Sequence, residues 1–188
     1  MYRERMPGEE KPAVRWLPFQ LNPDLSEAGI PREEYLERKF GPGHSHSYAR
    51  VAGVGREVGI EFAFEHITVQ PNTLHAHRLM IYGAKKGHED EVAENLFRAY
   101  FLEGTNLTDK AALADVGERA GLDRAALAAY LASDDDREQV LRADLEARQA
   151  GIKGVPFFIF NRRTAVSGAH APETLLQAMP DAGPREEE

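Results

Sequence analysis

The sequence predicts an α/β protein whose sheet is built from both ends of the chain, with helices inserted between them. Three observations lead to this expectation. An apolar, strand-like segment lies near the N-terminus at 13–20, helical patterns fill 71–149, and a strand–turn–strand pattern follows at 154–167. Because the strands at both ends must bury their apolar faces against other elements, a shared sheet with a helical insertion is the simplest arrangement.

Length, composition and charge fit this picture. The chain has 188 residues, of which 42% are hydrophobic and 29% charged, as in ordinary soluble domains. A formal charge of −8 argues against a nucleic-acid partner, which would need a basic face. No apolar run reaches the ~20 residues that span a bilayer. Residues 1–8 lack the apolar core of a signal peptide, so we expect no membrane partner and a cytoplasmic location.

The chain contains no cysteine. Structural disulfides, thiolate metal sites and a cysteine nucleophile are therefore excluded within these residues.

The N-terminal third is predicted to hold a strand, two helices and an extended segment. The strand covers 13–20 and ends near Pro18. A helix over 31–40 is favoured by Pro31 in its first turn and is stopped by Gly41. A second helix is expected over 44–58, weakened by internal glycines, and the alternation at 60–64 indicates a short strand or extended segment.

The middle of the chain predicts five helices separated by capping residues and glycines. Asn72 or Thr73 caps a helix that ends at Gly87, Thr108 caps the third helix, and Asp123 caps the fourth. The predicted helices cover 73–86, 89–101, 109–120, 124–132 and, after three aspartates, 137–150.

The C-terminal part predicts a hairpin and a last helix. The strand at 157–160 (FFIF) is apolar on both faces and is expected to be buried. Residues 161–163 form the turn, 165–168 the return strand, and 172–179 the helix. The acidic residues 181–188 are expected to be disordered.

Eight short motifs along the chain resemble, in order and spacing, the DsbA family of thioredoxin-like proteins, and within it the FrnE-like branch. They are 16–23 (WLPFQLNP), 39–41 (KFG), 59–62 (GIEF), 71–73 (PNT), 76–79 (AHRL), 96–101 (LFRAYF), 151–158 (GIKGVPFF) and 166–169 (VSGA).

The resemblance implies a thioredoxin-like fold with a large helical insertion. Residues 1–64 would hold the first part of the thioredoxin-like domain and the start of the insertion, 65–150 the insertion, and 151–180 the rest of the domain. It also implies thiol–disulfide oxidoreductase or isomerase chemistry on protein or small-molecule thiols. Family members carry a Cys-x-x-Cys motif after their first strand, at a helix N-terminus that lowers a thiol pKa.

This sequence lacks that strand, helix and motif. Three explanations are open: an internal methionine taken as the start, a truncated sequence, or a short form that fills the gap by forming a homodimer or by rearranging. We expect the working protein to be longer and this chain alone to be inactive in thiol exchange.

Two groups of residues are predicted to bind substrate. The resemblance implies a cis Val155–Pro156 bond that presents the Val155 backbone, the alternative being a purely structural turn. Further candidates lie at the start of the helix over 73–86, where Asn72 could act only as a cap and the others could bind substrate or serve structure. These further candidates are Asn72, Thr73, His77 and Arg78, with Trp16 and Phe19 lining a groove or the core.

No metal site is predicted. His75 and His77 would point about 200° apart on a helix, and the pair at His44 and His46 lacks a third ligand. No cofactor is expected either. Two alternatives to redox chemistry stay open: a glutathione-dependent isomerase or transferase of the 2-hydroxychromene-2-carboxylate isomerase or kappa-class type, with glutathione as co-substrate, and a non-catalytic binding module.

Overall fold

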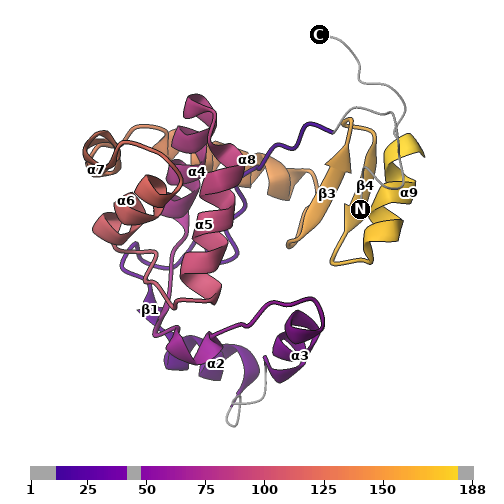
Figure 1. Ribbon diagram of the computed structural model, residues 1–188, viewed down its shortest axis with the longest axis horizontal. Helices are drawn as coiled ribbons and strands as arrows, with labels where there is room; N and C mark the ends of the chain where they lie inside the picture. The colour runs from indigo at the N-terminus through magenta and orange to yellow at the C-terminus, as the bar shows by residue number, and fades with distance from the viewer. Residues whose placement is uncertain (1–11, 42–47, 182–188) are drawn as a thin grey trace. The chain divides into compact units, whose positions relative to one another are not determined.

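The computed structural model describes residues 12–41 and 48–181 (Figure 1). The chain divides into two compact units. The helical unit is Trp16–Asp144, and the hairpin unit comprises, among the described residues, 12–15 and 145–181. The predicted His44–His46 pair and the acidic tail beyond 181 lie outside the described residues. The predicted boundary at 64/65 does not coincide with this division, because 16–64 belong to the helical unit.

The helical unit contains a short two-stranded ladder that the sequence did not predict. Strands β1 (Ile30–Pro31) and β2 (Val69–Gln70) pair antiparallel, with Ile30 opposite Gln70. Each strand has only two residues, too few for a periodic pattern to develop. The ladder places helix α2 (Arg32–Phe40) beside β2, and helix α3 (Ala49–Glu57) and a 3-10 turn (Phe64–His66) lie between them in sequence.

The remaining helices of this unit follow the predicted order. They are α4 (Leu74–Lys86), α5 (Glu89–Phe101), α6 (Lys110–Arg119), α7 (Arg124–Ala132) and α8 (Arg137–Gln149), and the division between the units falls inside α8. The apolar faces of α4, α5, α6 and α7 form one core. Its members include Leu79, Val92, Leu113, Leu127 and Leu131, all fully buried.

Two glycines allow helices of this core to approach closely. A Cβ at Gly83 of α4 would lie 2.7 Å from Val92 of α5, and one at Gly117 of α6 would overlap Leu127 of α7. At these points the backbone of α4 packs directly against a side chain of α5, and the backbone of α6 against a side chain of α7.

The helix boundaries follow local chemistry, with one correction. Asp123 caps α7 by accepting from the Ala126 amide at 2.7 Å, and Gly87 ends α4 with φ 79°, both as predicted. Helix α6 is capped by Asp109, whose carboxylate accepts from Ala111 and Ala112, so the prediction of Thr108 as the cap was wrong. Aspartate is at least as good a cap as threonine, and it lies one residue closer.

The hairpin unit holds strands β3 (Phe157–Phe160) and β4 (Thr164–Ser167), followed by helix α9 (Pro172–Asp181). The strands pair antiparallel, with Phe157 opposite Ser167. Positive φ angles of 49° at Asn161 and 60° at Arg162 give the turn the handedness that fits twisted strands.

The prediction of a buried strand at 157–160 was wrong. None of its residues is buried, and Ile159 is 49% exposed. The reason is that β3 pairs only with β4 among the described residues, in a sheet of two strands, which leaves apolar side chains partly open to solvent.

The prediction of a strand at 13–20 was also wrong. The segment is irregular and takes part in no sheet of the described residues. A strand exists only through ladder hydrogen bonds to a neighbour, and no described segment offers them here. Residues 60–63 have no regular secondary structure and Phe64 begins the 3-10 turn, so no strand forms at 60–64.

Candidate functional site

The loop before β3 contains a cis peptide bond between Val155 and Pro156, as predicted. The Pro156 carbonyl accepts from the Gly168 amide at 2.9 Å, which ties the loop to the end of β4. Val155 is 51% exposed, and its backbone amide and carbonyl make no hydrogen bond within the part of the chain that the structure describes. The loop thus presents one donor and one acceptor that an extended segment could pair with.

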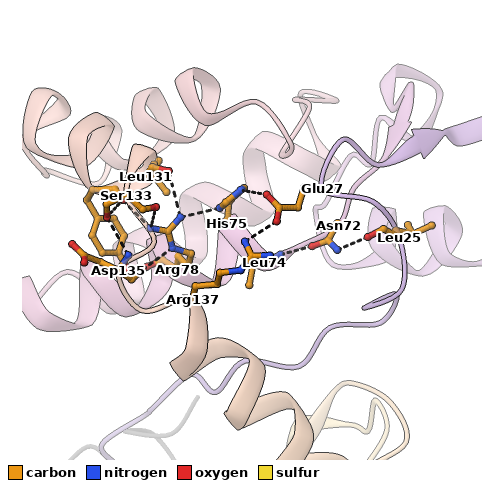
Figure 2. A network of polar contacts seen from close by, with 11 residues as sticks. Leu25, Glu27, Asn72, Leu74, His75, Arg78, Leu131, Ser133, Asp135 and Arg137 are labelled. Atoms are coloured by element: carbon orange, nitrogen blue, oxygen red, sulfur yellow. Dashed lines mark hydrogen bonds and ion pairs between the residues drawn. The ribbon is translucent and has the colours of Figure 1, made fainter.

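The start of α4 is organised by Asn72 (Figure 2). Its side-chain oxygen accepts from the Leu74 amide at 2.9 Å, and its amide nitrogen donates to the Leu25 carbonyl at 2.7 Å. Thr73 occupies the cap position without a side-chain cap bond. Asn72 therefore both caps the helix and holds the segment around Leu25, which favours the structural alternative for this residue.

Arg78 lies in the interior of the helical unit with no exposed surface (Figure 2). Its guanidinium donates to four backbone carbonyls between the end of α7 and the start of α8, and it lies 5.0 Å from the centre of the Tyr130 ring. The four carbonyls belong to Tyr130, Leu131, Ser133 and Asp135. Because the guanidinium is occupied by the protein's own backbone, the geometry favours the structural alternative for Arg78.

His75 connects Arg78 to the N-terminal part of the helical unit. An arginine can only donate, so the His75 Nδ1 that lies 3.0 Å from Arg78 must be an acceptor. The proton is then on Nε2, which donates to the Glu27 carboxylate at 3.0 Å. The same carboxylate pairs with Arg137 at 2.6 Å.

Burial and these contacts shift the pKa values of His75 and Glu27. Burial lowers the pKa of His75, so the imidazole is neutral at pH 7. The hydrogen bond from Arg137 lowers the pKa of Glu27. This network was not predicted from the sequence, although His75 and Arg78 are three residues apart on one helix face, a spacing that allows side chains to interact.

His77 and Phe19, two of the residues predicted to bind substrate or to serve structure, are in contact. The His77 Nε2 donates to the Phe19 carbonyl at 3.1 Å, and burial lowers the pKa of His77. The Phe19 side chain is buried. Gln20 follows Phe19 in the chain, and its backbone amide donates to the Asp144 carboxylate of α8 at 2.7 Å. The segment around Phe19 is therefore fixed to both α4 and α8.

Trp16 lies against the first turn of α5. Its backbone amide donates to Glu89 at 2.9 Å and its indole N–H to Asp90 at 3.0 Å, while its ring meets Phe97 edge to face. Trp16 is 41% exposed. Trp16 thus keeps an open aromatic surface, whereas Phe19 does not.

The described residues offer binding groups and no metal site. No cluster of three or more His, Asp or Glu side chains that could hold a metal ion occurs among them. Val155 and Pro156 lie in the hairpin unit, and the other six predicted site residues lie in the helical unit. Their assignment to substrate binding stays a prediction.

Comparison with known proteins identifies the family. Residues 4–180 match the model of the DSBA-like thioredoxin domain, and the chain belongs to this family. It is 26% identical over 189 residues to the uncharacterized protein YwbO of Bacillus subtilis (strain 168), covering 96% of this chain and 86% of that protein.

A solved structure agrees with this assignment. The crystal structure of the probable DsbA oxidoreductase SCO1869 from Streptomyces coelicolor superimposes with a TM-score of 0.79 at 26% identity. The match covers 90% of this chain and 75% of that one. The fold is therefore a DsbA-like thioredoxin fold, as predicted, and it is mostly helical with small sheets. The predicted sheet shared by both ends of the chain was wrong for the described residues, whose strands form two separate two-stranded sheets.

Within the described ranges, 12–41 and 48–181, no helix is both long enough and apolar enough to cross a membrane.

Proposed function

We propose that this chain is the substrate-binding part of a DsbA-like thiol–disulfide oxidoreductase. The observation that carries the proposal is the exposed Val155 backbone before the cis Pro156, in a chain that belongs to this family. A disulfide-bearing peptide, or a small thiol compound with a peptide backbone, would pair with the free amide and carbonyl of Val155. The similar chain whose name reads probable DsbA oxidoreductase supports this assignment.

The chemistry of exchange requires a thiolate that these 188 residues do not contain. A thiolate attacks one sulfur of a disulfide, a new S–S bond forms, and the other sulfur leaves with the electron pair as a thiolate. The attacking sulfur must come from residues outside this sequence or from a second thiol compound. The present chain therefore supplies binding, and by itself it exchanges no disulfide.

Glutathione-dependent isomerase or transferase chemistry is the second candidate. The observation that favours it is the same absence of cysteine, because such an enzyme activates the thiol of bound glutathione and needs none of its own. It would use the same Val155 backbone to hold the peptide-like co-substrate.

The intact mass of the natively expressed protein, with peptide mapping of its N-terminus, is the decisive measurement. We expect a mass above 21.0 kDa and a Cys-x-x-Cys upstream of this sequence. A serine at the first of those positions would move the assignment to glutathione chemistry. A mass of 21.0 kDa would overturn the redox proposal and leave glutathione chemistry or a non-catalytic binding module.

A binding experiment on the 188-residue chain tests the role of the loop separately. With oxidised glutathione as the probe, we expect amide chemical-shift changes centred on Val155 that are lost in Pro156→Ala. Pro172→Ala, which changes the first residue of α9, is the matched control and should leave them in place. Equal shifts in all three proteins would contradict the proposed site.

A further inference from the structure

Arg32 is a buried cation without a carboxylate partner. It begins α2, is 8% exposed, and its amide donates to the Thr68 carbonyl at 2.8 Å. Its guanidinium donates to the side-chain oxygen of Gln70. Among the described residues no acidic side chain lies within ion-pair distance of it, and Glu34 on the same helix pairs with Arg38 instead. Buried charges in proteins are normally paired, so we expect an anion to bind beside Arg32.

Aromatic rings flank the guanidinium without using up its donors. Its central carbon lies 5.4 Å from the centre of the Tyr35 ring and 5.0 Å from that of Tyr48. Cation–π contacts of this kind compensate part of the charge. They leave most of the five N–H groups free for acceptors in the guanidinium plane.

The hydroxyl of Tyr100 is sealed from solvent and has no hydrogen-bond partner within the described part of the chain. Arg32, Tyr48 and Tyr35 lie close enough to act on it electrostatically, and burial raises the pKa of Tyr100 to about 12. It is therefore a protonated donor without an acceptor, which carries a free-energy cost in an empty site.

Tyr35 adds a further donor. Lys39 donates to its hydroxyl oxygen at 3.1 Å, so the hydroxyl hydrogen is available for another acceptor. Lys39 also brings a second positive charge to the same edge. The group thus combines two cations with phenolic hydroxyls. Tyr35, Tyr48 and Tyr100 are each only partly buried, so the group lies near the surface of the helical unit.

We propose that Arg32, Tyr35, Tyr48 and Tyr100, here called the Arg32 cluster, bind the oxyanion of a small molecule. The groups are donors and the charge is positive, which excludes a cation as ligand. A carboxylate or a phosphate fits a guanidinium in bidentate fashion and accepts from phenols. This site lies wholly in the helical unit and is independent of the Val155 loop.

Calorimetric titration of the 188-residue chain tests the proposal, with sodium succinate and inorganic phosphate as probes at constant ionic strength. We expect saturable binding of one of them, and the stronger of the two identifies the ligand as carboxylate or phosphate. Tyr100→Phe should weaken binding about tenfold, the size of one hydrogen bond to a charged group. Arg32→Gln should weaken it about a hundredfold or more.

Matched variants separate a binding role from a packing role. Tyr82→Phe and Arg98→Gln remove a hydroxyl and a charge elsewhere in the same unit and should leave the affinity unchanged. Tyr100→Phe should leave the stability of the empty protein unchanged or higher, because it removes an unsatisfied donor. If Arg32→Gln fails to fold, Tyr100→Phe decides alone. Absence of saturable binding for both probes, or wild-type affinity in Tyr100→Phe, overturns the proposal.

Discussion

The helical unit buries a core, and the hairpin unit does not. Among the residues that the structure describes, every buried side chain belongs to the helical unit, from Pro18 to Asp144. The hairpin unit has regular strands and a helix, yet all of its described side chains keep some exposure, and Val155 and Ile159 are about half exposed. Both units contain regular strands and helices, but within the described ranges only the helical unit buries side chains.

The difference separates two contributions to structure. A hairpin forms where turn chemistry and strand propensity agree, as at Asn161 and Arg162, without any core. Stability requires apolar area removed from water, and a two-stranded sheet is marginal by itself. The apolar residues of β3 therefore keep surface in contact with water unless substrate, a second copy or additional chain covers it.

Truncation of a core residue should produce the largest difference between the units in the free energy of unfolding that is lost. Leu79→Ala empties a site with no exposed surface and should lower the free energy of unfolding by about 2–5 kcal/mol. Ile159→Ala, its counterpart in the hairpin unit, should cost less than about 1 kcal/mol because the side chain is half exposed. Urea unfolding followed by circular dichroism measures both. Equal costs would mean that β3 is covered in solution.

Removal of the buried guanidinium should come next. Arg78→Met leaves four backbone carbonyls without their donor and should cost about 2–4 kcal/mol. Arg98→Met is the control, since Arg98 is exposed and pairs with Glu94 on α5, and it should cost less than about 0.5 kcal/mol. A cost for Arg78→Met as small as that of the control would show that solvent replaces the bonds, and would reopen a binding role for Arg78.

Mild acid should weaken the helical unit. Burial lowers the pKa values of His75 and His77 below the ordinary 6.5, so the unfolded chain takes up protons first as the pH falls through that value. The free energy of unfolding should then decrease between about pH 7.5 and 5.5. The lowered pKa of Glu27 adds a separate loss at lower pH, below about 4.5.

Urea midpoints across this range measure the effect. A stability that is flat, or that rises toward pH 5.5, would contradict neutral imidazoles at these two positions. His75→Gln should reduce the slope, because the substituted side chain does not titrate.

Loss of a helix cap should have the smallest effect. Asp123→Ala removes the acceptor for the Ala126 amide at the start of α7 and should cost about 1 kcal/mol. Asp123→Asn keeps a side-chain oxygen and should retain most of that stability. Amide hydrogen exchange should show the loss in the helical unit and no change in β3 and β4. A change that spreads to the hairpin would show that the two units unfold together.

Much of the fold was predictable because its signals are local. The predicted ends of α4 and α7 rest on Gly87 and Asp123, which act within one helical turn, and the predicted turn at 161–163 rests on neighbouring residues. The cis bond at Pro156 was predicted from the family motif around it, since the dipeptide alone favours trans. Apart from the cap of α6, the failures were non-local. Segment 13–20 has the composition of a strand and has no ladder partner among the described residues.

The candidate site was predictable in its residue types and less so in their roles. The sequence allows Arg78 and Asn72 either to bind a substrate at the surface or to donate hydrogen bonds inside the protein. Only their partners in the structure distinguish these two roles. Those partners lie 57 and 47 residues away in the chain, at Asp135 and Leu25. Arg32 was not singled out at all, because nothing in its neighbourhood in sequence indicates that α2 turns it inward beside Tyr48 and Gln70.

The sequence by itself determined the order of the helices, most of their caps, the C-terminal hairpin, the family and the lack of a thiol. These depend on short-range spacing or on composition, which can be read directly. The tertiary structure decided which polar groups are buried, which apolar residues of β3 stay exposed, and whether 13–20 could be a strand. Those outcomes depend on hydrogen-bond partners and covering surfaces far away in the chain, and a linear pattern carries no information about distance in space.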